Sequence, residues 1–149
     1  MAQIGTAFYT GLYRHTLDDK GRVTIPSSWR STHSEAESFL ATPQPGGYIA
    51  VLPPSEAEKM HAKMAAVTMG DGAAQDWAAL YFSEAQTFTF DKQGRVMLDS
   101  GLLAHAGIVK DAVLVGSMNK FNIYSPSHWD KIVAARATDK SEVMRRLGI

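Results

Sequence analysis

Lys20 and Arg22 flank Gly21 in the segment Asp18-Asp19-Lys20-Gly21-Arg22, whose composition is typical of a tight turn between two strands. An aspartate at the first position can accept a hydrogen bond from the backbone two residues later, and a glycine at the fourth adopts a positive φ easily. A lysine ammonium can bind a phosphate, and an arginine guanidinium can donate two hydrogen bonds to guanine O6 and N7. The pattern therefore predicts a slim, basic tip whose side chains are of the types that can contact a nucleic-acid groove, and Arg14 on the preceding strand could extend it.

The same pattern occurs a second time, 73 positions later. Residues 17–25 align without a gap on residues 90–98, and the same offset places Tyr48 on Phe121 and Pro53 on Pro126. In this alignment the second turn has the counterparts Asp91, Gly94 and Arg95, with Lys92 as its lysine and Gln93 in the place of Lys20. We conclude that the chain contains two copies of one unit.

The charged residues of the turns have a second interpretation. Asp18 can pair with Arg22, and Asp91 with Arg95, so that each pair holds its turn together. We favour this structural role for both aspartates, because a carboxylate beside DNA repels phosphate, and we assign the same role to Gly21 and Gly94. For Lys20 and Arg22 we favour contact with DNA, mainly because of the family resemblance described below, whereas for Lys92 and Arg95 the two interpretations are equally good.

Each copy predicts the same series of elements around its turn. Alternating apolar and polar residues predict a strand on either side of the turn, and a short helix and two further strands follow. The predicted strands span 12–17, 22–25, 39–41 and 48–52 in the first copy, and 86–90, 95–98, 113–116 and 121–124 in the second. The short helices are expected at 27–32 and 100–105.

Longer helices are predicted after the last strand of each copy. Ser55 and Glu58 have the spacing of a capping box, and Ser127 and Asp130 occupy the matching places in the second copy. A break is expected at 70–72, with a linking helix at 73–80. We therefore divide the chain into a first unit (12–55), a helical connector (56–84), a second unit (85–128) and a C-terminal helical segment (129–149).

Composition narrows the class of protein. The chain has 149 residues, 15 basic and 15 acidic side chains, and no cysteine. This composition is globular and excludes a disulfide scaffold or a thiolate metal site. There is no apolar run long enough to cross a membrane, and residues 1–11 lack the pattern of a secretory signal, so we expect a cytoplasmic protein. Residues 1–30 and 131–149 are basic, whereas residues 31–76 are acidic.

Motifs for catalysis are missing from the sequence. The five histidines do not have the spacing of metal ligands, and there is no nucleophile elbow, phosphate loop or dinucleotide fingerprint. Asp18 and Asp19 are adjacent on a turn and have no accompanying base or nucleophile. We therefore predict no catalytic residue, cofactor or metal, and a hydrolase that uses Asp18, Asp91 or a histidine is the weakest alternative.

Over most of its length, from about residue 8 to about residue 131, the chain resembles the MraZ family of bacterial transcriptional regulators. The resemblance rests on residues 17–26, on residues 90–96 followed by His105-Ala106-Gly107-Ile108, and on residues 113–116 followed by 119–124. It implies a mainly β fold with peripheral helices (α+β), in which tandem swapped-hairpin AbrB-like units form one pseudo-symmetric β-barrel. The sequence departs from the family pattern at Gln93, at Asp99 in the place of Pro26, and in a connector, 72–85, without lysine or arginine.

The resemblance also implies a function. Members repress the division and cell-wall gene cluster by binding repeated elements in double-stranded DNA upstream of their own operon. They act as ring-like homo-oligomers in the cytoplasm, associated with the nucleoid. The alternative that the sequence leaves open is a ring-forming protein-interaction scaffold or antitoxin-like module, whose active surface would be its helices and whose DNA binding would be weak and non-specific.

Overall fold

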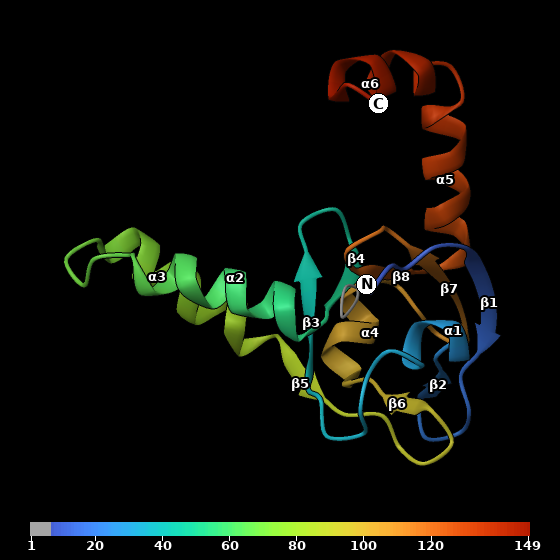
Figure 1. The fold of residues 1–149 in the computed structure, drawn as a ribbon, viewed down its shortest axis with the longest axis horizontal. Helices are drawn as coiled ribbons and strands as arrows, with labels where there is room; N and C mark the ends of the chain where they lie inside the picture. The colour runs from blue at the N-terminus through green and yellow to red at the C-terminus, as the bar shows by residue number, and fades with distance from the viewer. Residues whose placement is uncertain (1–6) are drawn as a thin grey trace, which may run out of the picture.

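A computed structural model describes residues 7–149; residues 1–6, part of the segment examined for a secretory signal, lie outside the described range. The same order of elements occurs twice (Figure 1). The first series is β1 (Leu12–Thr16), β2 (Arg22–Thr24), α1 (Ser27–Arg30), β3 (Phe39–Gln44), β4 (Tyr48–Leu52), α2 (Pro54–Ala65) and α3 (Gly72–Ser83). The second is β5 (Gln86–Phe88), β6 (Arg95–Met97), α4 (Ser100–His105), β7 (Asp111–Gly116), β8 (Phe121–Tyr124), α5 (Pro126–Arg136) and α6 (Lys140–Leu147).

The strands of the two repeats interleave in one six-stranded sheet of order β1-β7-β8-β4-β3-β5. The first strand of each repeat pairs with the third strand of the other: Leu12 lies opposite Val115, and Phe39 lies opposite Phe88. The last strands of the two repeats, β4 and β8, pair with each other at the centre. Neither repeat therefore completes its own sheet.

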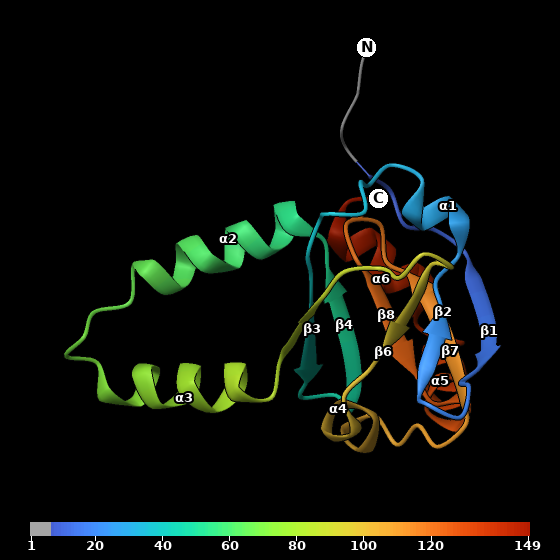
Figure 2. The ribbon, with the colours of Figure 1, turned by 90° about the horizontal axis from the view of Figure 1, so that it is seen from below.

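The second strands, β2 and β6, form a separate two-stranded antiparallel ribbon over the sheet (Figure 2). Val23 lies opposite Val96, which is also its counterpart in the repeat, so the pseudo-twofold axis passes between these two residues. The predicted α+β class with a β core and peripheral helices is confirmed. The closed barrel is not confirmed, because β1 and β5 remain edge strands of the larger sheet among residues 7–149.

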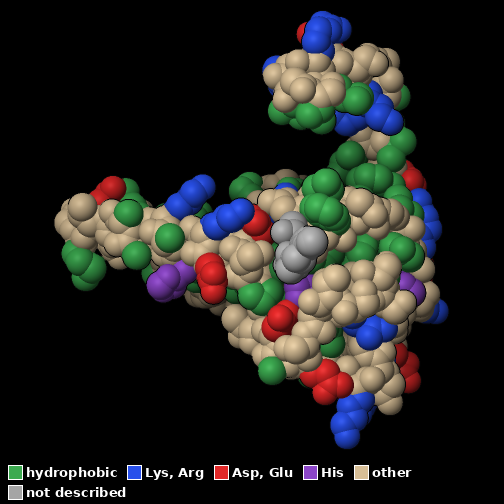
Figure 3. Space-filling model, viewed as in Figure 1, with side chains coloured by type: hydrophobic (Ala, Val, Ile, Leu, Met, Phe, Trp, Pro, Cys, Tyr) green, Lys and Arg blue, Asp and Glu red, His purple; other side chains and the backbone are tan. Residues whose placement is uncertain are grey.

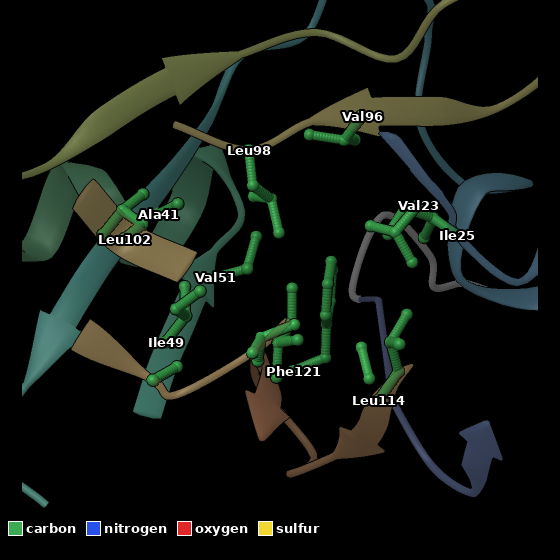
Figure 4. Close-up of a cluster of buried hydrophobic side chains, with 14 of the residues drawn as sticks. Val23, Ile25, Ala41, Ile49, Val51, Val96, Leu98, Leu102, Leu114 and Phe121 are labelled. Carbon is green, nitrogen blue, oxygen red and sulfur yellow. The ribbon is translucent and has the colours of Figure 1, made fainter. Parts of the chain in front are cut away.

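The hydrophobic core fills the space between the ribbon and the sheet. Figure 4 shows ribbon side chains directed toward side chains of the sheet strands. The ribbon and the residues just after it contribute Val23, Ile25, Val96 and Leu98, and the sheet contributes Ile49, Val51, Leu114, Phe121 and Ile123. Burial of each such side chain stabilises the fold by about 1.5–3 kcal/mol relative to exposure. The core therefore fixes the ribbon, and with it both turns, on the sheet.

The longer helices lie outside this core. The α2–α3 hairpin extends away from the sheet (Figure 2), and α5 carries α6 away from it in another direction (Figure 1). No residue of α2, α3, α5 or α6 is buried. None of the helices between residues 7 and 149 combines the length and the apolar character that crossing a membrane requires.

The predicted capping boxes are wrong. Helix α2 has Pro53 at its N-cap and no capping side chain, because Pro54 begins the helix and places Ser55 inside the first turn. In the second repeat the cap is Ser125, whose hydroxyl accepts a hydrogen bond from His128 N at 3.2 Å. The cap therefore lies two residues before the predicted Ser127.

Candidate nucleic-acid interface

The first turn is held by the carboxylate of Asp18. One carboxylate oxygen accepts hydrogen bonds from the backbone N–H groups of Lys20 and Arg22, at 3.0 and 2.9 Å. The other accepts a hydrogen bond from Arg22 Nε at 2.6 Å. Gly21 donates its N–H to the Asp18 carbonyl at 2.9 Å and has a φ of 76°. Asp18 thus shapes the turn and orients the Arg22 guanidinium.

The second turn repeats this arrangement bond for bond. Asp91 accepts from the backbone N–H groups of Gln93 and Arg95, at 2.9 and 2.8 Å, and from Arg95 Nε at 2.9 Å. Gly94 has a φ of 75°. One contact has no counterpart in the first turn, since Arg95 Nη2 donates to the amide oxygen of Gln93 at 3.1 Å. The Arg95 guanidinium is therefore more fully engaged within the protein than that of Arg22.

Hydrogen bonds from the turn lower the pKa of both aspartates below the ordinary value of 3.8. The backbone N–H of Arg22 makes the largest contribution for Asp18, and that of Arg95 does so for Asp91. A carboxyl with a lowered pKa stabilises the folded state fully above 3.8, and this stabilisation is lost as the pH falls through the folded-state pKa.

We therefore expect the wild-type protein to lose stability below pH 3.8 more steeply than the Asp18→Asn/Asp91→Asn variant. Urea unfolding between pH 2.5 and 6 measures the difference, and carbon NMR titration reports the two carboxyl groups directly. Parallel acid profiles for the two proteins would contradict the assignment. Asp19→Asn is the matched control, because the Asp19 side chain makes no hydrogen bond or ion pair within residues 7–149.

The β2–β6 ribbon brings the two turns together. Ile25 N donates to the Gly94 carbonyl at 2.9 Å, and Leu98 N donates to the Gly21 carbonyl at 3.4 Å. Arg95 Nη1 lies 3.9 Å from the Asp18 carboxylate that also binds Arg22. The structure thus places two predicted DNA-binding arginines around one carboxylate, although they lie far apart in the sequence.

The two predicted lysines are free of protein partners. Lys20 and Lys92 are exposed, and their ammonium groups form no ion pair or hydrogen bond with residues 7–149. Figure 3 shows basic and acidic side chains together at the end of the molecule that carries the turns. Arg14 is exposed on the edge strand β1, where it lines a shallow hollow with Asp111 and Pro126. It has no bond to either turn in the described part of the chain.

Arg30 is a cation near the turns that sequence reasoning missed. Its Nε donates to the Ile25 carbonyl at 2.9 Å, and its guanidinium lies over Gly94 of the second turn. The counterpart of Arg30 is Leu103, which packs against Gly21 of the first turn. Because the repeats interleave, the short helix of each repeat reaches the turn of the other. No local sequence signal reveals this contact.

This difference gives a matched test of the two glycines. A Cβ at position 94 would lie 2.2 Å from Arg30 Cζ, whereas at position 21 the nearest atom, Leu103 Cδ1, would lie at 3.7 Å. Both substitutions to alanine force a left-handed conformation that costs about 1–2 kcal/mol. Gly94→Ala also displaces Arg30 from its hydrogen bond, which adds about 1 kcal/mol. Urea unfolding should therefore rank Gly94→Ala as the less stable variant, and equal losses would contradict the role of Arg30.

The arrangement suits anion binding better than catalysis. Lys20 and Lys92 present unpaired ammonium groups, and Arg22, held through Nε, has two further guanidinium nitrogens with no hydrogen bond to residues 7–149. A carboxylate that binds a guanidinium through Nε fixes the direction of the two outer nitrogens of that guanidinium. These nitrogens can then donate to two acceptors in one plane, such as guanine O6 and N7. Across residues 7–149, no three histidine, aspartate or glutamate side chains are grouped so that they could hold a metal ion.

Fold and site together define a tandem-repeat protein in which two Asp-x-x-Gly-Arg turns are held side by side on a β core. Comparison with known proteins agrees: the family described as "MraZ protein, putative antitoxin-like" matches residues 81–147. Relatives that are 32–37% identical over most of the chain show that the chain belongs to the MraZ family.

Curated relatives cover most of the chain. A protein of Lactobacillus gasseri is 37% identical over 82% of this chain and 84% of its own length. Relatives from Symbiobacterium thermophilum and Heliobacterium modesticaldum are 33% and 32% identical over 93% of this chain, and the matches cover 99% and 96% of their lengths. All three are named "Transcriptional regulator MraZ".

Proposed function

We propose that this protein is a sequence-specific DNA-binding transcriptional regulator that represses the bacterial division and cell-wall gene cluster. The observation that carries the proposal is the pair of turns, which present Lys20 and Lys92 to solvent while Asp18 orients Arg22. The names of the relatives, which describe regulators, support the same class of function. In this proposal the cytoplasmic protein associates with the nucleoid and blocks polymerase at the promoter of its own operon.

The five predicted cations have different roles in the proposed complex. Lys20 and Lys92 bind phosphates, since both are exposed and their ammonium groups have no partner among residues 7–149, and Arg14 extends the phosphate contacts along β1. Arg22 reads a base edge, because its outer nitrogens are unengaged. Arg95 contributes charge near the same position while its own guanidinium remains tied to Asp91 and Gln93. Asp18, Asp91, Gly21 and Gly94 shape the turns.

One copy of the ribbon makes few contacts, so specificity requires several copies. We propose that the two repeats are AbrB-like swapped-hairpin units of one pseudo-symmetric barrel. Several copies of the chain assemble into a ring, and their turns engage repeated promoter elements. Binding of the first element raises the effective concentration of the remaining turns near the next, which increases the overall affinity without new contacts.

Fluorescence anisotropy tests this proposal with the duplex upstream of the protein's own gene and a shuffled duplex of equal composition. Both are titrated over a salt series. We expect tighter binding to the native duplex and a steep loss of affinity with salt, because phosphate contacts release counterions. Equal and weak binding to both duplexes would instead favour the alternative of a protein-interaction scaffold or antitoxin-like module.

A further inference from the structure

An apolar groove of about 500 Å³ lies between the α2–α3 hairpin and the neighbouring strands β3 and β5 of the sheet. Most of its lining side chains are hydrophobic, and Glu58 and His61 also line it. The hydrophobic ones include Phe39, Ala57, Met60, Met64, Ala78 and Phe82. Neither helix of the hairpin contains a buried residue, and α3 has Asp76 as its single charged side chain. A helix so apolar is normally covered on more than one side, which indicates that this hairpin has a partner.

Helix α6 is a second surface without a partner in the described chain. Val143, Met144 and Leu147 fall on one face at helical spacing, and Met144 and Leu147 are 44% and 64% exposed. Arg145 lies on the opposite side of the helical wheel, Arg146 lies at the edge of the apolar face, and Lys140 falls on that face one turn before Met144. The helix has eight residues and is about 12 Å long, shorter than the 12-residue helices α2 and α3 beside the groove.

The two surfaces have complementary charges. Around the groove, residues 54–84 include more acidic than basic side chains: Glu56, Glu58, Asp71, Asp76 and Glu84 against Lys59 and Lys63. Within α6 the balance is reversed, with Lys140, Arg145 and Arg146 against Glu142. Glu58 itself lines the groove. An amphipathic basic helix is therefore a suitable occupant of this groove, and the chain supplies one.

We propose that α6 of one copy docks in the α2–α3 groove of a second copy. The two surfaces project from different parts of the molecule and lie apart in Figure 1. A contact between two different surfaces of identical chains is heterologous, and it leaves one free groove and one free α6 until a ring closes. This inference rests on the proposed ring and assigns the elements that build it.

Chemical cross-linking tests the contact directly, because the chain has no cysteine of its own. The double variant Met64→Cys/Leu147→Cys is treated with a bismaleimide, which bridges thiols across a range of distances. We expect a ladder of covalent multimers whose longest member gives the ring size. The control Met64→Cys/Glu142→Cys, with its second thiol on the side of α6 opposite the apolar face, should give far less. A cross-link confined to single chains, or none, would overturn the proposal.

Sedimentation velocity then distinguishes failure of the α6 contact from failure of the proposed ring. We expect wild type to sediment as an oligomer, Met144→Asp/Leu147→Asp as a monomer, and the charge-matched control Thr138→Asp/Ser141→Asp as wild type. All four positions are exposed or half-buried, so circular dichroism should show intact folding. An oligomeric Met144→Asp/Leu147→Asp variant would overturn the α6 contact and leave the ring standing. A monomeric wild type would overturn both.

Discussion

Replacing Lys20 and Arg22 with alanine is expected to produce the largest loss of DNA affinity of any pair of substitutions in this protein. An arginine that reads a base edge is worth about 1–3 kcal/mol, which corresponds to a loss of roughly 5- to 150-fold in affinity. Loss of the Lys20 phosphate contact should weaken binding to every sequence. It should also lower the magnitude of the slope of the logarithm of the affinity against the logarithm of the salt concentration by about one, because one fewer counterion is released. In the proposed ring every subunit would carry the change, so the combined loss should exceed that of one site.

The matched control removes two positive charges elsewhere. Lys63→Ala/Lys131→Ala alters exposed lysines on α2 and α5, away from the ribbon, and gives the same change in net charge. Anisotropy titration of the native and shuffled duplexes should show that this control keeps its preference for the native duplex. Equal losses for the two double variants would mean that net charge, and not the turn, determines binding. Arg22→Lys alone should relax specificity more than affinity, because lysine cannot bind two acceptors in one plane.

Trp29→Ala should cause the largest loss of stability, about 3–5 kcal/mol, as expected for removal of a buried tryptophan. Trp29 is 2% exposed and stacks on Phe121 at a ring distance of 4.9 Å. Its edges contact Tyr9 and Tyr13, and its indole N–H donates to the Thr10 carbonyl at 2.9 Å. Removing this side chain disconnects α1 from the segment before β1, and urea unfolding measures the cost.

Two further variants show which property of Trp29 matters. Trp29→Phe keeps the ring packing on Phe121 but leaves the Thr10 carbonyl without its donor, so we expect a smaller loss of about 1–3 kcal/mol. Val109→Ala, at a position 93% exposed, should leave stability within about 0.5 kcal/mol of wild type. A loss below about 1 kcal/mol for Trp29→Ala would contradict the packing described around α1.

The features that could be predicted from the sequence are those with short-range causes. The Asp18 turn depends on bonds between residues at most four positions apart, and Asp91 repeats them, so their composition alone predicts both turns. The short strands and helices follow from local alternation and from the register of the repeat. Helix α3 begins at Gly72, one residue before its predicted start, because Asp71 caps it by accepting a hydrogen bond from Ala74 N, and it ends at Ser83, three residues beyond its predicted end.

The features that escaped prediction depend on residues far apart in the chain. Arg30 reaches Gly94 only because strands of opposite repeats pair, and no spacing in the sequence encodes that contact. The capping boxes failed for a different reason, since Pro54 shifts the start of α2 and Ser125 caps α5 from an unexpected position. The sequence likewise contains the apolar face of α6 but gives no indication that the folded monomer leaves it uncovered.

The interleaved strand order has a consequence for the way the chain folds. Leu12 at the start of β1 pairs with Val115 in β7, and Phe39 in β3 with Phe88 in β5, so the edge pairs of the sheet join distant segments. During synthesis β1 cannot pair until β7 has been made, whereas β3 can pair early with β4, which directly follows it. Such long-range pairing is slow and exposes unpaired strands to other chains. We therefore expect folding in milliseconds to seconds, and a chain cut between its repeats should not yield two stable halves.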